Sequence, residues 1–273
     1  MNDRSVRILD ILANNNSIKV TLLAELLDVS QVTLRKDLDF LEKQGIIRRS
    51  HGNASLDGAD DTARRMAFNY PVKRKIAKAA AQIVDKNETI MLESGSCCVL
   101  FAEELALAGK NVTIVTNSIY IANYTRYSPN IKIILLGGLF QPDSNVLVGS
   151  ITKNCAENFY IDKFFIGADG FISEQGFTGR DFLRIETVLE LAKCANKTFI
   201  LTESAKFQRR GAFGLINLDK IAGVITDDHI SKDAEASLLK HNIQLTKISS
   251  NEEIIKWRKF PGIPPVMYKE KGE

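Results

Sequence analysis

The segment from Ser30 to Leu38, which reads SQVTLRKDL, constrains the fold more than any other part of the chain. A helix turns by roughly 100° per residue, so Leu34, Leu38 and Leu41 lie along one apolar face. The Ser30 hydroxyl can accept a hydrogen bond from a first-turn amide, which predicts that the helix begins there, and Gly45 predicts its end. The pattern therefore predicts one amphipathic helix with a polar outer face.

Two further amphipathic helices are predicted upstream. Residues 20 to 27 carry leucines at helical spacing, and a turn of three residues, 28 to 30, separates them from the next helix. Residues 5 to 12 form another apolar stripe, which ends at the asparagines 14 to 16. Three short helices with a tight turn between the last two are typical of a helix-turn-helix.

A two-stranded hairpin is predicted after these helices, with strands at 46 to 50 and 54 to 56 around turn residues 51 to 53. A hairpin at this place is the wing of a winged helix. In a helix-turn-helix the second helix lies in the DNA major groove, and cations beside it contact phosphates. The predicted DNA-binding residues are Ser30, Gln31, Val32, Thr33, Arg35 and Lys36 on the helix and Arg48, Arg49 and His51 on the wing.

The alternative for the cations is that Arg35 and Lys36 only solvate an ordinary surface helix. The helical spacing, the tight turn and the basic hairpin would then have to coincide by chance, which favours DNA binding. The formal net charge of +3 adds nothing to this argument, because it is too small to imply a nucleic-acid partner. The inference depends on where the cations lie.

Composition limits the remaining function classes. A chain of 273 residues with 45% apolar content fits two unequal globular domains. No apolar run approaches the roughly 20 residues that span a bilayer, and the N-terminus lacks the apolar core of a signal peptide, so we expect a cytoplasmic protein without a membrane partner. Four cysteines without a CxxC pair and three scattered histidines predict no disulfide framework and no metal site, and we expect no cofactor.

The expected domain boundaries follow from changes in pattern. We expect a winged helix-turn-helix DNA-binding domain over 1–57, a linker over 58–71, an effector-binding domain over 72–250 and a loosely ordered tail over 251–273. The linker is placed where the sequence DGADD, residues 57 to 61, lacks any apolar stripe.

The larger domain alternates helical stripes with short β-branched runs, which predicts the α/β class with a mostly parallel sheet flanked by helices. We expect strands at 89–92, 112–116, 131–136, 164–166, 198–201 and 222–226, and helices at 72–84, 97–108, 118–127, 183–195 and 232–241. Ligands in such sheets bind beyond the carboxyl ends of the strands. Small and polar residues are frequent at these ends.

These strand ends supply the candidate effector-binding residues: Glu93, Ser94, Gly95, Ser96, Cys97, Thr116, Asn117, Gly137, Gly138, Asp169 and Lys206. The loop from residue 93 to 97 opens a helix and is suited to cradle a phosphate, although a plain turn has a similar composition. The paired glycines fit either close approach to a ligand or a tight turn. Taken singly, Asp169 is typical of a turn and Lys206 of a solvated surface. Because such polar and charged residues recur along one edge of the sheet, they favour a polyanionic polyol as ligand.

Several motifs occur in the order found in one known family. Residues 29 to 38 resemble V-S-x-x-T-[IL]-R-[RK]-D-L, and residues 49 to 54 resemble R-x-H-G-G-A with Asn53 in place of the second glycine. Residues 93 to 97 and 203 to 207 resemble D-[SA]-G-[ST]-T and D-S-S-K-F. The chain thus resembles the DeoR-type bacterial transcription regulators from about Asp3 to Ile248. Because asparagine tolerates positive φ, Asn53 is expected to allow the turn with slight strain.

The resemblance implies a regulatory domain related to sugar-phosphate isomerases and coenzyme A transferases. It implies a repressor that binds a double-stranded DNA operator as a homodimer or homotetramer, senses a phosphorylated sugar or polyol, and is not an enzyme. Two aspartates of the family pattern are glutamates here, Glu93 and Glu203, and Cys97 replaces a threonine, so the pocket is expected to differ in shape. The alternatives are an active sugar-phosphate isomerase with a DNA-binding appendage and a structural nucleoid protein.

Overall fold

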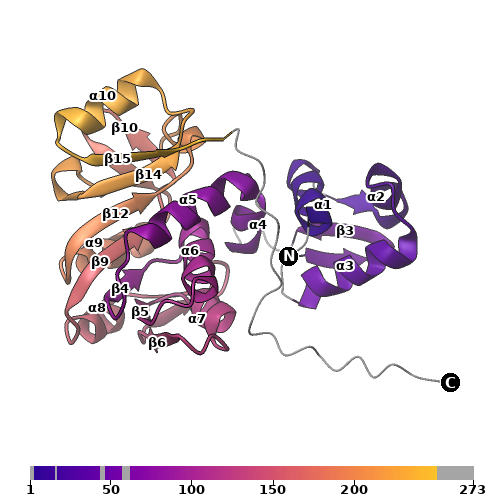
Figure 1. Ribbon diagram of the computed structural model, residues 1–273, viewed down its shortest axis with the longest axis horizontal. Coiled ribbons are helices and arrows are strands. Elements are labelled where there is room, and N and C mark those ends of the chain that lie inside the picture. Colours follow the sequence, from indigo (N-terminus) through magenta and orange to yellow (C-terminus); the bar gives the residue numbers. More distant parts are fainter. Residues whose placement is uncertain (1–2, 16, 44–46, 57–61, 251–273) are drawn as a thin grey trace.

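The computed structural model describes residues 3 to 15, 17 to 43, 47 to 56 and 62 to 250. They form an N-terminal unit, residues 3 to 56, and a larger C-terminal unit, residues 62 to 250 (Figure 1). The predicted helix end at Gly45, the first part of the predicted linker and the predicted tail after residue 250 lie outside the described residues.

The N-terminal unit contains the three predicted helices and the predicted hairpin. Its elements are α1 (Asp3–Asn14), β1 (Ile18–Lys19), α2 (Val20–Leu26), α3 (Gln31–Lys43), β2 (Ile47–Ser50) and β3 (Asn53–Leu56). Leu34, Leu38 and Leu41 of α3 are fully buried against Ile8 and Leu12 of α1, so the apolar stripes form one core. The strand β1 was not predicted, because two residues are too short to show a period; it pairs with β3 and gives the sheet order β1-β3-β2.

The turn of the hairpin corrects one expectation. Positive φ falls on His51, at 50°, and on Gly52, at 78°, whereas Asn53 begins β3 and pairs with Ser50. The left-handed conformation therefore lies one residue earlier than the family pattern suggested, and the strain expected at Asn53 is not there. Two left-handed residues in a row are typical of the tight turns that join antiparallel strands.

The segment predicted as a linker is largely helical where the structure describes it. Residues Thr62–Ala67 form α4, and α5 (Tyr70–Gln82) begins at the end of the predicted linker. Met66 and Ala67 are buried in the same apolar cluster as residues of α1. Thr62 also donates a hydrogen bond of 3.1 Å from its hydroxyl to the Ser144 carbonyl. The apolar stripe of α4 consists only of Met66 and Ala67, and it is too short to reveal this packing in the sequence.

The C-terminal unit is built on the predicted parallel sheet. Its strand order is β15-β14-β12-β9-β4-β5-β6, with β4 (Thr89–Leu92), β5 (Val112–Thr116), β6 (Ile131–Leu135), β9 (Ile161–Ile166), β12 (Ala195–Leu201), β14 (Gly223–Asp227) and β15 (Gln244–Ile248). All six pairings between these neighbours are parallel. Successive residues of a strand point to opposite faces, and Phe164 and Phe165 accordingly belong to the two separate apolar clusters.

Helices cover both faces of this sheet. The cluster on one face includes residues of α5, α6 (Ser96–Leu107) and α7 (Ile119–Thr125). The cluster on the other includes residues of α8 (Ser150–Ala156), α9 (Phe182–Ala192) and α10 (Lys232–Lys240). The α/β prediction is thereby confirmed. Among the described residues, no helix has both the length and the apolar character needed to cross a membrane.

Several smaller elements were not predicted: α8, β15, the hairpin of β7 (Leu139–Gln141) and β8 (Val146–Val148), and a three-stranded sheet of β10 (Gly170–Ile172), β11 (Gly176–Gly179) and β13 (Phe213–Ile216). Most are only three or four residues long, so they carry no readable alternation. Short 3-10 helices occur at Ser204–Lys206 and Leu218–Lys220.

The chain runs outward from β4 through β5 to β6 and then returns to β9, on the other side of β4. Between β4 and β9 the sheet therefore has the switch point at which such folds bind ligands.

Candidate functional site

The outer side of α3 presents the polar face that the sequence predicted. Gln31, Val32, Arg35 and Lys36 are exposed, and Val32 keeps 65% of its surface accessible. Ser30 is the cap: its Oγ accepts a hydrogen bond of 3.2 Å from the Thr33 amide. The outer face therefore offers an apolar contact and two cations to a groove, while the cap defines where the helix begins.

The inner side of α3 fixes the helix against α1. Asp37 is buried on this side and forms an ion pair with Arg4 of α1. Together with the buried leucines, this pair sets the rotation of α3 about its own axis. The direction in which Arg35 and Lys36 point is thus determined by residues on the opposite face.

The wing residues divide into two kinds. The Arg49 guanidinium lies 2.6 Å from Asp39 and 2.6 Å from Glu42, both on α3. These ion pairs occupy Arg49 and hold the wing against the helix. Arg48 and His51 are exposed, so their side chains are accessible to a partner.

A pocket of about 410 Å³ lies at the carboxyl ends of β4, β9 and β12, where the topology places it. The structure brings six of the predicted effector-binding residues together on its wall: Glu93, Gly95, Ser96, Cys97, Asp169 and Lys206. Its cationic residues include five that the sequence did not single out for this site: Arg65, Lys73, Arg180, Arg184 and Arg209. The wall is thus assembled from segments that are far apart in the sequence.

Five other predicted residues do not line the pocket. Ser94 and Thr116 are fully buried, and the Thr116 hydroxyl donates a hydrogen bond of 2.7 Å to the Leu92 carbonyl. Asn117 donates from its side-chain amide to the Leu147 carbonyl. A side chain at Gly138 would clash with Thr152 and Val148, so Gly138 allows close packing, whereas a Cβ at Gly137 would make only ordinary contacts. Ser94, Thr116 and Asn117 thus support the loops after β4 and β5, and Gly137 and Gly138 lie in the connection between β6 and β7.

The start of α6 faces the pocket. Gly95 is its N-cap in extended conformation, and no side chain caps the helix there. Ser96 and Cys97, the first residues of α6, line the pocket. The positive end of the helix dipole and its unpaired first-turn amides make such a place favourable for an anion. Burial raises the pKa of the Cys97 thiol to about 12, so Cys97 contributes a neutral side chain.

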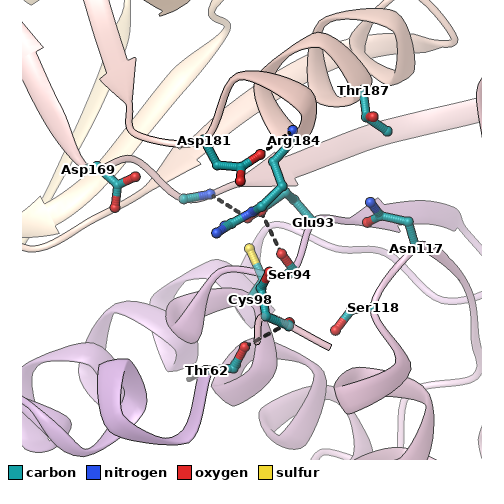
Figure 2. A network of polar contacts seen from close by, with 12 residues as sticks. Thr62, Glu93, Ser94, Cys98, Asn117, Ser118, Asp169, Asp181, Arg184 and Thr187 are labelled. Carbon is teal, nitrogen blue, oxygen red and sulfur yellow. Dashed lines mark hydrogen bonds and ion pairs between the residues drawn. The ribbon is translucent and has the colours of Figure 1, made fainter. Parts of the chain in front are cut away.

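An ion pair crosses the pocket between β4 and α9. Arg184 of α9 donates to Glu93 over 3.3 Å, and the two side chains point toward each other in Figure 2. The same carboxylate accepts a hydrogen bond of 2.8 Å from Ser94, and its other oxygen lies 3.4 Å from the Gly167 amide. A Cβ at Gly95 would lie 2.9 Å from the Glu93 carboxylate and 3.2 Å from the Gly167 backbone, so a side chain there would displace this carboxylate or the backbone. Glu93 is therefore committed to the frame of the site.

Two further carboxylates, those of Asp169 and Asp181, line the pocket (Figure 2). Asp181 caps α9 by accepting a hydrogen bond of 2.8 Å from the Arg184 amide. Asp169 accepts one of 3.2 Å from the Arg180 amide through Oδ2. Each bond employs one oxygen of the carboxylate, and the second oxygen can accept a hydroxyl proton of a ligand.

Lys73 is the most buried cation of the pocket wall. Its residue surface is 3% exposed, and its Nζ lies 3.5 Å from Glu203 Oε2. Burial lowers the pKa of the Lys73 ammonium, and the nearby Glu203 carboxylate partly offsets this. The sequence held one signal for Lys73: it shares the apolar stripe of α5 with Ile76, Ala77 and Ala80, where an ordinary surface lysine does not belong.

Family models match both units. The model of the DeoR-like helix-turn-helix domain matches residues 4–65, and that of the DeoR C terminal sensor domain matches residues 68–228. Among curated proteins, the HTH-type transcriptional regulator GolR of Listeria innocua is 36% identical over 84% of this chain and 92% of its own length. A putative aga operon transcriptional repressor of Escherichia coli O157:H7 is 27% identical over 89% of this chain and 92% of its own.

A solved ribose 5-phosphate isomerase A of Methanocaldococcus jannaschii is a distant structural match, with a TM-score of 0.38 and 20% identity over 51% of this chain and 55% of that chain. The likeness is too low to support any argument about function. The family models, by contrast, span both units in the order the motifs predicted. The chain therefore belongs to the DeoR family of helix-turn-helix transcriptional regulators.

Proposed function

We propose that this regulator represses a sugar or polyol catabolic operon and is released from its operator when a phosphorylated sugar or polyol occupies the pocket. One observation carries the proposal: the pocket combines an uncapped helix start and cations with carboxylates that have oxygens left to bind hydroxyls. A phosphate group and a chain of hydroxyls are the two chemical features that such a wall recognises together.

The phosphate is assigned to the start of α6. Ser96 and Cys97 supply first-turn amides, and Lys206 supplies a cation from the loop after β12. An ammonium neutralises a phosphate as a point charge, and the helix dipole adds to the same effect. Arg65 and Lys73 add positive charge to the pocket wall.

The hydroxyls are assigned to Asp169 and Asp181. A carboxylate accepts hydrogen bonds but donates none, so it selects hydroxyl groups over further anions. Glu93 is held by Arg184, Ser94 and the Gly167 amide, and it therefore shapes the pocket without serving as the main hydroxyl acceptor.

On the DNA side, the exposed face of α3 enters the major groove with Arg35 and Lys36 as the leading contacts. Two such units are needed for two half-sites, so we propose that the protein acts as a homodimer or a higher oligomer. Ligand binding has to weaken operator affinity by about 5–150-fold, which corresponds to a coupling of about 1–3 kcal/mol.

The test uses the full-length protein and the DNA upstream of its own gene. A thermal-shift screen with pentose, hexose and polyol monophosphates identifies the effector, and gel-shift titration then measures operator affinity with and without it. We expect a stabilising sugar phosphate that lowers affinity, and Lys206→Ala is expected to lose this response while binding DNA normally. Stable binding to the upstream DNA with no response to any of these compounds would contradict the effector part of the proposal.

The same compounds separate regulation from catalysis. Incubation of the purified protein with ribose 5-phosphate or glucosamine 6-phosphate is expected to leave both unchanged. Isomerised product that disappears in Lys206→Ala would favour an enzyme with a DNA-binding appendage.

A further inference from the structure

The helix α4 lies between the N-terminal unit and the helices α5 and α6 of the C-terminal unit (Figure 1). Arg65, near its end, and Phe68, just after it, line the pocket. Met66 and Ala67, between them, are buried in the apolar cluster that also contains Ile8 of α1, and α4 contacts α1. A displacement of α4 would therefore change the surface on which α1 rests.

Lys73 holds the C-terminal end of α4. Its Nζ donates hydrogen bonds to the Arg65 and Phe68 carbonyls, which are among the last carbonyls of that segment. The last carbonyls of a helix lack the donors that a following turn would supply, so a buried cation can bond them and also meets the negative end of the dipole. The left-handed Asn69, with φ of 52°, reverses the chain so that the first turn of α5 places Lys73 behind α4.

Lys73 also lines the pocket. An ammonium has three N–H groups, and two are taken by the carbonyls at the end of α4. Glu203 Oε2 lies 3.5 Å from the same Nζ, and it is a buried atom that accepts no hydrogen bond from the described residues. A ligand oxygen that reaches this pair can bond the ammonium only by replacing one of its present acceptors.

We propose that Lys73 is the positioning residue that couples the pocket to the DNA-binding unit, by sharing its three donors between Glu203 and the end of α4. This inference rests on the proposed function, because it assigns a route to the effector response of the same pocket. A ligand bound beside Glu203 draws the ammonium away from the Arg65 and Phe68 carbonyls. The end of α4 then loosens under α1. Two alternative sets of acceptors give the two discrete arrangements that allosteric coupling needs.

Hydrogen exchange of the full-length protein without ligand tests the first half of this route. Lys73→Met removes all three donors and keeps an unbranched side chain, and Lys78→Met makes the same change at an exposed position of α5. We expect faster amide exchange over residues 62–68 and in α1 for Lys73→Met, and no change for Lys78→Met. Exchange in α1 that equals the wild type in Lys73→Met overturns the coupling.

A second variant decides the question if Lys73→Met fails to fold. Glu203→Gln removes the pocket charge at nearly constant size, so the ammonium is expected to rest on the two carbonyls alone. Exchange over residues 62–68 should then be slower than in the wild type. Equal or faster exchange in Glu203→Gln overturns the proposal, because Lys73 would then not be shared between pocket and helix.

The second half of the route is tested by hydrogen exchange with ligand bound. Glucose 6-phosphate is the probe, and inorganic phosphate is the reference. In the wild type we expect protection over residues 93–99 and faster exchange in α1. Glu203→Gln is compared at a ligand concentration that gives the same protection over residues 93–99 as in the wild type, and there the ligand should no longer accelerate exchange in α1. An undiminished response of α1 in that variant overturns the proposal. Absence of protection in the wild type removes glucose 6-phosphate as a ligand of the pocket, and the ligand-free comparison still decides on Lys73.

Discussion

The outer face of α3 and the wall of the pocket hold their charges in opposite ways. Arg35 and Lys36 are exposed beside a buried leucine stripe, so they are available to a partner and cost little to replace. In the pocket, Arg184 is paired with Glu93 and Lys73 with Glu203, in surroundings that exclude most water. An exposed surface of this kind therefore depends on single side chains, whereas the pocket depends on buried ion pairs.

The largest effect is expected from breaking a pocket pair. Arg184→Met leaves Glu93 buried without its cation, and removing one partner of a buried pair typically costs about 3–5 kcal/mol. We expect this loss in urea unfolding followed by circular dichroism. Lys193→Met, on an exposed pair with Glu190, is the control and should stay within about 0.5 kcal/mol of the wild type. Equal stability of Arg184→Met and the control would mean that the pocket does not depend on this pair.

A cavity under α3 should have the next largest effect. Leu38 is fully buried, and Leu38→Ala is expected to destabilise the N-terminal unit by about 2–5 kcal/mol. DNA binding should fall with it, because the exposed cations lose their platform. Val32→Ala, on the exposed face of the same helix, should leave thermal stability unchanged and alter only DNA affinity. Reversal of this order would place the buried face of α3 elsewhere.

The exposed cations should act on DNA without acting on stability. Arg35→Ala is expected to weaken operator binding by about 1–3 kcal/mol if the guanidinium meets a base, or to lower the salt slope by about one unit if it meets a phosphate. Titrations at several salt concentrations separate the two results. Affinity and slope that both match the wild type would remove Arg35 from the DNA interface.

The smallest effect separates the two wing arginines. Arg48→Ala should reduce the salt slope of DNA binding by about one unit and leave stability unchanged. Arg49→Ala should lower stability by less than about 1 kcal/mol, because its pairs with Asp39 and Glu42 are partly exposed. Thermal melts and salt titrations of both variants test this division. It fails if Arg49→Ala changes the salt slope more than Arg48→Ala does.

The same contrast explains which features were predictable from the sequence. The helices of the N-terminal unit and strands such as Thr89–Leu92 and Val112–Thr116 follow from local periodicity, and the structure has them at nearly the predicted positions. The loop from Glu93 to Cys97 could be placed at the pocket because it directly follows a strand of the sheet.

Other features depend on contacts between distant segments. Arg184 enters the pocket from a helix whose sequence shows an ordinary amphipathic pattern, and its partner lies 91 residues away along the chain. Lys73 stands out in the apolar stripe of α5, but the sequence does not show which group it meets, because Glu203 lies 130 residues away. Thr116 and Gly138 are polar or small at strand ends, as ligand-binding residues often are, yet they pack within the protein. A single sequence does not distinguish these cases, because burial is decided by tertiary packing.

The central claim is that the exposed face of α3 binds DNA and that the pocket controls this binding. Fluorescence anisotropy of labelled upstream DNA, titrated with full-length protein at one salt concentration, tests it most directly when a sugar phosphate from the stability screen is added. We predict tight binding that weakens by about 5–150-fold with the sugar phosphate in the wild type and stays tight in Lys206→Ala. Equal weakening of both proteins, or no binding of the wild type to this DNA, would contradict the account.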